Sequence, residues 1–229
     1  MDSLPDWIAS LPEAWTSGLS PEVFSVAHLS YQSPGRFYHG WDHAVSCIEK
    51  LRTIPCEDGR VVFLSLLFHD AIYVAGRKDN ESRSADLAVS TLRQHSNVPD
   101  AQLSFVREII LATAHHVAAA SASRDLKVAL DIDMSILGSA PAEYARYASD
   151  VAKEYCPSVT SAQKFAAGRI AFLKQVLAQS RIFHLPETVE KWELPARMNI
   201  AREIEGMREL QGWFWRLITM LLTRKGELP

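Results

Sequence analysis

VVFLSLLFHDAIYVAG, residues 61–76, is an almost continuous apolar run that holds His69 and Asp70 side by side in its middle. A run that is apolar all round predicts the central, buried helix of a helical domain. Burying an imidazole next to a carboxylate costs free energy unless something pairs with both groups. A divalent metal ion could pair with them, because histidine nitrogen and aspartate oxygen are common metal ligands. A buried His–Asp hydrogen bond that only supports packing is the alternative.

Two histidines precede this run in YHGWDH, where His39 and His43 stand four residues apart. His43 starts a stripe at helical spacing, which predicts that its side chain points inward. The other members of the stripe are Cys47, Ile48 and Leu51. His39 would share this side of the helix if the helix reached it. Gly40 lies between the two histidines, so His39 could equally lie on a loop, capping a helix start or binding a carboxylate.

Two acids follow the run in DIDMSILG, namely Asp131 and Asp133. On a helix their side chains diverge by about 200°, so only one of them can face a given ion. His115 and His116 lie between the run and these acids. A helix predicted from residue 100 onward brings His116 to nearly the same face as its buried stripe. His116 is therefore a candidate for the site as well as for the core.

The order His43, then His69 with Asp70, then Asp133 resembles the HD superfamily of metal-dependent phosphohydrolases, which is named for the adjacent pair. Further segments look like one bacterial branch of predicted HD phosphohydrolases, in the same order. They are YQSPGRFYHGWDH, FHDAIYVAGRKDNESRSA, ATAHH, LDIDMSILG, residues 144–155, AAGRIAFL and PARMNIAREIE. The resemblance covers most of residues 31–205.

This resemblance implies an all-α fold, a single-domain HD-type helical bundle around a metal site. It implies four ligands, His43, His69, Asp70 and Asp133, with Asp131 behind the site or capping a helix. Two imidazoles and two carboxylates leave about two positions of an octahedral ion open for water and substrate. Manganese, iron, cobalt, nickel, magnesium or zinc would suit this set, although the lack of thiolates argues against a structural zinc site.

The expected activity is hydrolysis of a small phosphorylated metabolite, foremost a nucleotide, by metal-activated water. Asp70, His39 and His116 are the candidate catalytic residues. The phosphate needs cationic partners, and Arg36 is the first candidate because it lies on a loop shortly before His43. Further candidate residues for the substrate site are Arg77, Lys78, Arg169 and Glu81. Arg169 also suits a buried ion pair, and Glu81 suits the first turn of a helix capped by Asn80.

Two other functions remain open. A sensor module could bind a nucleotide and a metal without turnover, although the presence of all four expected ligands favours an enzyme. The HD fold also resembles that of di-iron oxygenases, and His39, His115 or His116 could complete a second metal site.

The composition fits one domain spanning residues 1–229, with 48% apolar residues and no repeat or linker. Residues 1–30 are expected to form short helices or turns packed on this domain, and residues 196–229 a C-terminal helix. No segment alternates with a period of two, which again predicts an all-α fold. The apolar face of the C-terminal segment could pack on the core or join two subunits of a homodimer. Its residues are Trp213, Phe214, Trp215, Leu217, Ile218 and Leu221.

The net charge of -3 includes no basic block, so a nucleic-acid polymer is not an expected partner. Three widely spaced cysteines without a CxxC pair favour a reducing compartment over a disulfide framework. No apolar run approaches the roughly 20 residues that cross a bilayer, and the first residues lack a positive leader. The sequence therefore predicts a cytoplasmic protein that does not enter a membrane.

Overall fold

The computed structural model describes residue 8, residues 10–156 and residues 158–223, with side chains as far as residue 209. Every element in this part of the chain is a helix, which confirms the all-α prediction. The one β-type contact is an isolated bridge between Leu19 and Ser96. No helix among the described residues is long and apolar enough to cross a membrane. The three cysteines form no disulfide.

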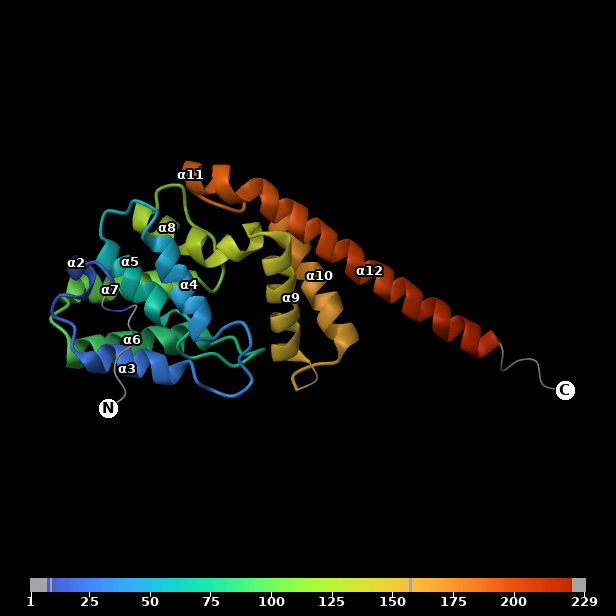
Figure 1. The fold of residues 1–229 in the computed structure, drawn as a ribbon, viewed down its shortest axis with the longest axis horizontal. Coiled ribbons are helices and arrows are strands. Elements are labelled where there is room, and N and C mark those ends of the chain that lie inside the picture. The colour runs from blue at the N-terminus through green and yellow to red at the C-terminus, as the bar shows by residue number, and fades with distance from the viewer. Residues whose placement is uncertain (1–7, 9, 157, 224–229) are drawn as a thin grey trace.

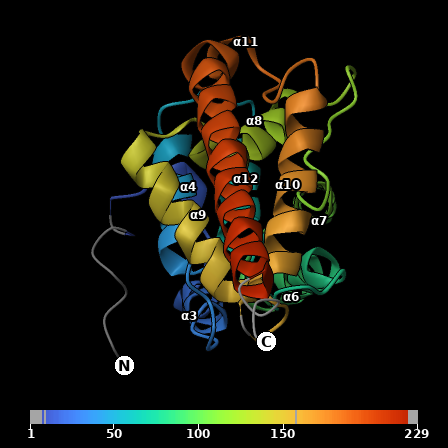
Figure 2. The ribbon, with the colours of Figure 1, turned by 90° about the vertical axis from the view of Figure 1, so that its right-hand side faces the viewer.

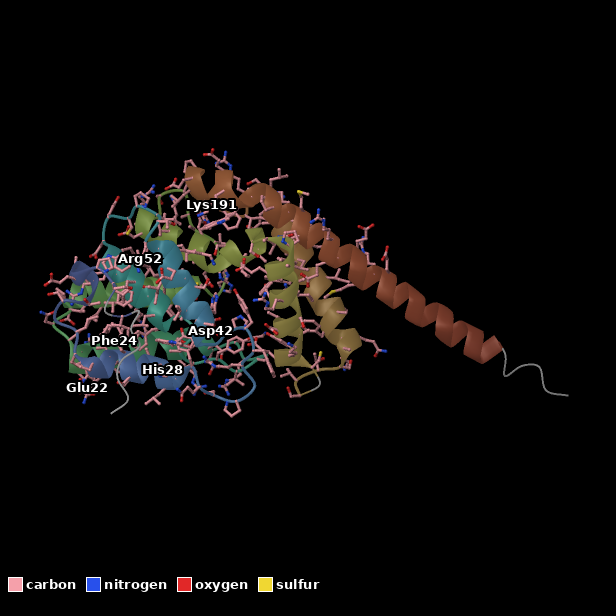
Figure 3. The ribbon with its side chains drawn as sticks, viewed as in Figure 1. Glu22, Phe24, His28, Asp42, Arg52 and Lys191 are labelled. Carbon is pink, nitrogen blue, oxygen red and sulfur yellow. The ribbon has the colours of Figure 1, made fainter. Side chains whose placement is uncertain are left out.

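The body of the molecule is built around α5 (Gly59–Phe68), which contacts the helices on every side of it (Figure 1). Its eight residues from Val61 to Phe68 are all buried. The surrounding helices are α2 (Glu13–Thr16), α3 (Pro21–Ser30), α4 (Trp41–Leu51), α6 (Asn80–His95), α7 (Asp100–Ala112) and α8 (Arg124–Asp133). Figure 3 shows how α3 joins them, with Phe24 directed into the body and Glu22 on its outer side. The apolar run thus forms the buried centre that its sequence predicts.

The prediction that this run stays helical to residue 76 is wrong, because α5 ends at Phe68. Side chains of α6 hold the backbone of the next segment, which forms turns and bends. The Ser84 hydroxyl bonds the amide and the carbonyl of Ile72 at 2.9 and 3.1 Å. The Asn80 amide does the same for Val74 at 3.0 and 3.1 Å. Because the Asn80 side chain binds the backbone of Val74, it does not cap α6, and the N-cap of this helix is Asp79. His69 and Asp70 consequently lie at the end of a helix, where the chain turns.

A second group of helices packs against one end of the body. It contains α9 (Pro141–Tyr155), α10 (Ala162–Ala178), α11 (Pro186–Thr188), the π-helix η2 (Val189–Glu193) and α12 (Leu194–Thr223). In Figure 2, α9 and α10 lie on either side of α12, and α10 contacts both. Pro195 is the second residue of α12, which follows η2 directly.

The 3-10 helix η1 (Met134–Gly138) joins the two groups and contacts α8, α9 and α12. Gly138 is required here, since a Cβ would come within 2.7 Å of the carbonyl oxygen of Trp192. Asn199 of α12 donates to the carbonyls of Leu137 and Ser139. The segment directly after Asp133 is thereby fixed against the C-terminal helices.

The expected N-terminal turns are present as α2 and α3, with residues 1–7 and 9 outside the described part. Beyond the body, α12 continues as the long helix at the right of Figure 1. The side chains of its apolar face, Trp213 to Leu221, lie outside the described residues. The homodimer stays a prediction.

Candidate metal centre and its cavity

Four donor atoms from three separate parts of the chain converge in the body. His43 Nε2 lies 3.1 Å from His69 Nε2 and 3.1 Å from Asp133 Oδ1. His69 Nε2 lies 3.2 Å from Asp70 Oδ2 and 3.4 Å from Asp133 Oδ1. The Asp70 oxygen is 3.8 Å from His43 Nε2. The structure therefore brings together the four side chains that the sequence suggested as ligands.

Each of these side chains is placed by a different local feature. His43 lies in the first turn of α4, on the inward stripe that its spacing predicted, and is 8% exposed. His69 follows the last residue of α5, and its Nδ1 donates to the Leu66 carbonyl at 2.9 Å. This bond leaves the Nε2 lone pair of a neutral ring to face the centre. Asp133 ends α8, just before η1.

The spacing of these atoms suits one metal ion. Ligands at about 2.1 Å from an octahedral ion lie about 3 Å apart when they occupy neighbouring positions. The separations of 3.1 to 3.8 Å between these donor atoms are close to this value. Cys47 lies behind His43, with Sγ at 3.8 Å from the imidazole. Its buried thiol could join His43 and Asp133 around an ion, but Cys47 does not itself line the cavity.

The charges in the centre are strongly coupled. Burial acts to lower the pKa of His43, but Cys47 and Asp133 outweigh it and raise the pKa to about 10. Burial also opposes the charged form of Asp133, yet the positive charge of His69 and hydrogen bonds from His116 and His43 hold the carboxyl pKa well below its usual range. The two carboxylates therefore attract about two positive charges, which one divalent cation can supply in place of protons.

His116 contacts the centre through Asp133, with its Nε2 at 2.8 Å from Oδ2. It does not lie on a helix as expected, because α7 ends at Ala112. His116 instead has a positive φ of 53°, an uncommon conformation for a residue with a side chain. The bond to Oδ2 orients the Asp133 carboxylate so that Oδ1 faces the histidines. His115 is exposed and does not line the cavity.

Asp131 points away from the centre, as the divergence of the two acids requires. Its buried carboxylate accepts hydrogen bonds from the amides of His184 and Leu185 and from the Thr188 hydroxyl. The His184 ring donates to it from Nδ1 at 2.7 Å. On the other side, His184 Nε2 accepts the Ala118 amide at 3.2 Å. Asp131 and His184 thus anchor the loop that carries His116.

His39 lies on the loop before α4, separated from the helix by the N-cap Gly40. Its Nδ1 donates to Glu154 Oε2 at 2.6 Å, and its ring stacks on Tyr73 at 4.0 Å between centroids. The second Glu154 oxygen accepts the amides of residues 37, 38 and 39. Glu154 is buried, and the bond to His39 helps to keep its carboxyl pKa below the ordinary value against the opposing effect of burial.

Arg36 is placed differently from the sequence prediction. Its guanidinium donates to the carbonyls of His39, Asp70 and Ala71 at 2.8 to 3.0 Å, and the side chain does not line the cavity. A guanidinium enclosed by three carbonyls is a structural clamp. Arg36 thus connects the loop of His39 to the turn that carries Asp70.

The centre opens into a cavity of about 580 Å³ lined by His39, Asp70, His116 and Asp133. Arg77 and Glu81 line it as predicted, with Arg77 forming a bidentate ion pair with Asp79. Lys78 is exposed and does not line it. Arg169 lines the far end, where it is buried and pairs with Glu203 at 2.9 Å and with the Tyr147 hydroxyl at 3.1 Å. These partners agree with the interpretation of Arg169 as a member of a buried ion pair.

The chain matches no protein-family model and no curated protein. The chemistry of the site therefore has to support any functional assignment by itself.

Three residues that the sequence did not single out belong to the site. Glu154 and His184 hold the two histidine-bearing loops. The Tyr38 hydroxyl is enclosed without a hydrogen-bond partner among the described residues, although Tyr38 lines the cavity and its ring lies 4.6 Å from that of His43. A buried acid in an otherwise apolar stripe, as at Glu154, was the one available signal.

Proposed function

We propose that this chain is an HD-type metal-dependent phosphohydrolase that acts on a small phosphorylated metabolite, with nucleotides as the foremost candidates. The observation that carries the proposal is the convergence of four donor atoms, from His43, His69, Asp70 and Asp133, at one end of a cavity. A bound divalent metal would polarise a phosphoryl oxygen and lower the pKa of a coordinated water. The side chains of the protein then have to bind and orient the substrate and protonate its leaving oxygen.

His39 is the proposed proton donor to the leaving oxygen. Its Nδ1 is engaged by Glu154, so Nε2 is the nitrogen available to the cavity, and the carboxylate stabilises the imidazolium. In the reaction the oxygen of water bonds to phosphorus, the bond from phosphorus to the ester oxygen breaks, and the alcohol leaves with the proton from His39. The proton of water passes to a carboxylate of the centre, for which Asp70 is the candidate because it lines the cavity.

The proposal leaves Arg77, Glu81 and Lys164 at the cavity to contact the substrate. Lys164 forms no ion pair with any described carboxylate within the salt-bridge distance, so its ammonium group is available to a polar or anionic group of the substrate. Arg77 would have to share its guanidinium with Asp79.

The oxygenase alternative needs a second metal ion. Among the described side chains, both groups that could hold an ion contain His43, so neither forms a separate second centre. The sensor alternative needs the same metal without turnover. The two alternatives predict different measurements.

The test combines metal analysis with phosphate release. Wild-type protein, His69→Ala, Asp133→Asn and the matched control Asp42→Asn would be purified, since Asp42 is an exposed acid beside His43. About one divalent metal per chain is expected in wild type and control, and little in the other two. Phosphate release from a panel of phosphomonoesters should follow the metal content and stop on chelation. Metal binding without turnover would favour the sensor, and about two irons with oxygen uptake the oxygenase.

A further inference from the structure

The cavity has two chemically different ends. The centre occupies one end, and mostly apolar side chains of α9, of α10 and of Val159 between them enclose the other. These are Tyr147, Val151, Tyr155, Val159, Phe165 and Phe172. The volume of about 580 Å³ lies within the range of about 300–1,000 Å³ that small-molecule sites occupy. An apolar wall of this extent is unfavourable against water, so a ligand with an apolar part is expected to cover it.

Gly168 lies in the middle of α10, on this wall. A glycine inside a helix destabilises it by about 1 kcal/mol relative to alanine. Its conformation is helical, and a Cβ at this position would meet no atom within 4 Å. Neither the backbone nor the packing therefore requires glycine. Gly168 is exposed and lines the cavity, so the missing side chain leaves the cavity open at this point.

Lys164, Gly168 and Phe172 are spaced by four residues and share one face of α10. Phe172 is 42% exposed, which is high for an aromatic ring beside a cavity. Beside this face, the rings of Tyr155 from α9 and Phe165 from α10 contact each other, with their centroids 5.7 Å apart. Aromatic side chains that line a cavity favour another flat ring as their partner. The face thus presents an ammonium group, an open space and an aromatic ring in that order.

We propose that the α9–α10 end of the cavity binds a flat, largely apolar ring in the alcohol part of the substrate. The ring lies over Gly168, and Lys164 contacts a polar or anionic substituent. This inference rests on the function proposed above and narrows its substrates to phosphomonoesters of ring-bearing alcohols. Short polyol phosphates would leave the aromatic wall uncovered.

The test compares substrates with and without an aromatic ring: 1-naphthyl phosphate against glycerol 2-phosphate, and adenosine 5′-phosphate against ribose 5-phosphate. Gly168→Leu fills the subsite, and its KM for the aromatic member of each pair should rise about tenfold or more, with less than a twofold change for the member that lacks the aromatic ring. Gly168→Ala is the control, expected to stabilise α10 and to change KM little. Metal content and the midpoint of thermal unfolding show that each variant is folded.

An equal change for both members of each pair would overturn the ring subsite while leaving the phosphohydrolase proposal intact. If the metal-loaded wild type releases no phosphate from any substrate, the phosphohydrolase proposal fails and the subsite is tested by binding. Calorimetry on the full chain would then compare 1-naphthyl phosphate with inorganic phosphate. Tighter binding of the naphthyl ester that Gly168→Leu abolishes supports the subsite, and equal affinities overturn it.

Discussion

His43 and His69 face each other through their Nε2 atoms at 3.1 Å, although they come from different segments of the chain. Because His69 donates from Nδ1 to the Leu66 carbonyl, its Nε2 is the basic nitrogen of the neutral ring. Two basic nitrogens at this distance compete for one proton or share one cation. The carboxylates of Asp70 and Asp133 at the same point favour the cation.

Substitutions of the two acids of the DIDM segment are expected to have different effects, one on metal binding and the other on stability. Asp133→Asn removes a donor that lies 3.1 Å from His43 Nε2, so bound metal should fall to a small fraction of the wild-type content. Asp131→Asn should keep the metal but lose about 2–4 kcal/mol of unfolding free energy, because its buried carboxylate holds the 184–188 segment. Elemental analysis and urea unfolding measure both quantities. The opposite ranking in metal content would exclude Asp133 as the ligand.

Tyr38→Phe removes a hydroxyl that has no partner among the described residues. An unsatisfied buried hydroxyl costs about 1–3 kcal/mol, so the variant should be at least as stable as wild type in the chelated protein. If the hydroxyl donates to a bound phosphate, turnover should fall about tenfold while metal content stays constant. Phosphate release and thermal unfolding after chelation check the two expectations. Unchanged turnover would restrict Tyr38 to packing against His43.

Local signals in the sequence predicted much of this structure. The inward face of α4 follows from apolar residues at helical spacing, and the divergence of Asp131 and Asp133 follows from helix geometry alone. The end of α5 at Phe68 could not be predicted in this way, because no glycine or proline precedes Gly76 in the run. The helix stops because Ser84 and Asn80, in the next helix, bind the following backbone.

Remote partners account for the missed site residues too. Glu154 is 115 positions from His39, and His184 is 53 positions from Asp131. Patterns among neighbouring residues in the sequence cannot show that such distant residues are in contact. The place of Arg36 on a loop near His43 predicts a contact with phosphate, but two of the carbonyls that its guanidinium binds belong to a turn 34 and 35 positions away.

His184 is expected to act on the site by positioning the loop of His116. The shorter side chain of His184→Asn can keep the hydrogen bond to Asp131 but cannot extend to the Ala118 amide. The longer side chain of His184→Gln can extend to the Ala118 amide but cannot keep the hydrogen bond to Asp131. His184→Asn should speed hydrogen exchange at the Ala118 amide, His184→Gln should do so less, and both should lower kcat several-fold at constant metal content. The nearby exposed His115→Asn is the control. Normal exchange at Ala118 in both variants would remove His184 from this role.

Glu154→Gln tests the dyad with His39 through its pH dependence. The pKa of Glu154 lies below its ordinary value of 4.5, so its carboxylate stabilises the fold above that pH and loses this effect as the pH falls through the lowered pKa. At pH 7 the variant should lose about 1.5–3 kcal/mol of unfolding free energy, and the difference from wild type should shrink below pH 4.5. Denaturant unfolding from pH 3 to 8 measures it. A difference independent of pH would show that the ionised carboxylate does not cause the effect.

Substitution of Arg36 distinguishes between a structural role, in which it binds three carbonyls, and a role in binding the phosphate. Lysine cannot reproduce a planar fork that binds three carbonyls, so Arg36→Lys should loosen the turn of Asp70. The expected result is a weaker metal affinity and a lower midpoint of thermal unfolding, with KM unchanged once metal saturates the protein. Metal titration and steady-state kinetics check this, with Lys78→Ala as an exposed control from the loop before α6. A higher KM at unchanged metal affinity would instead return Arg36 to the phosphate.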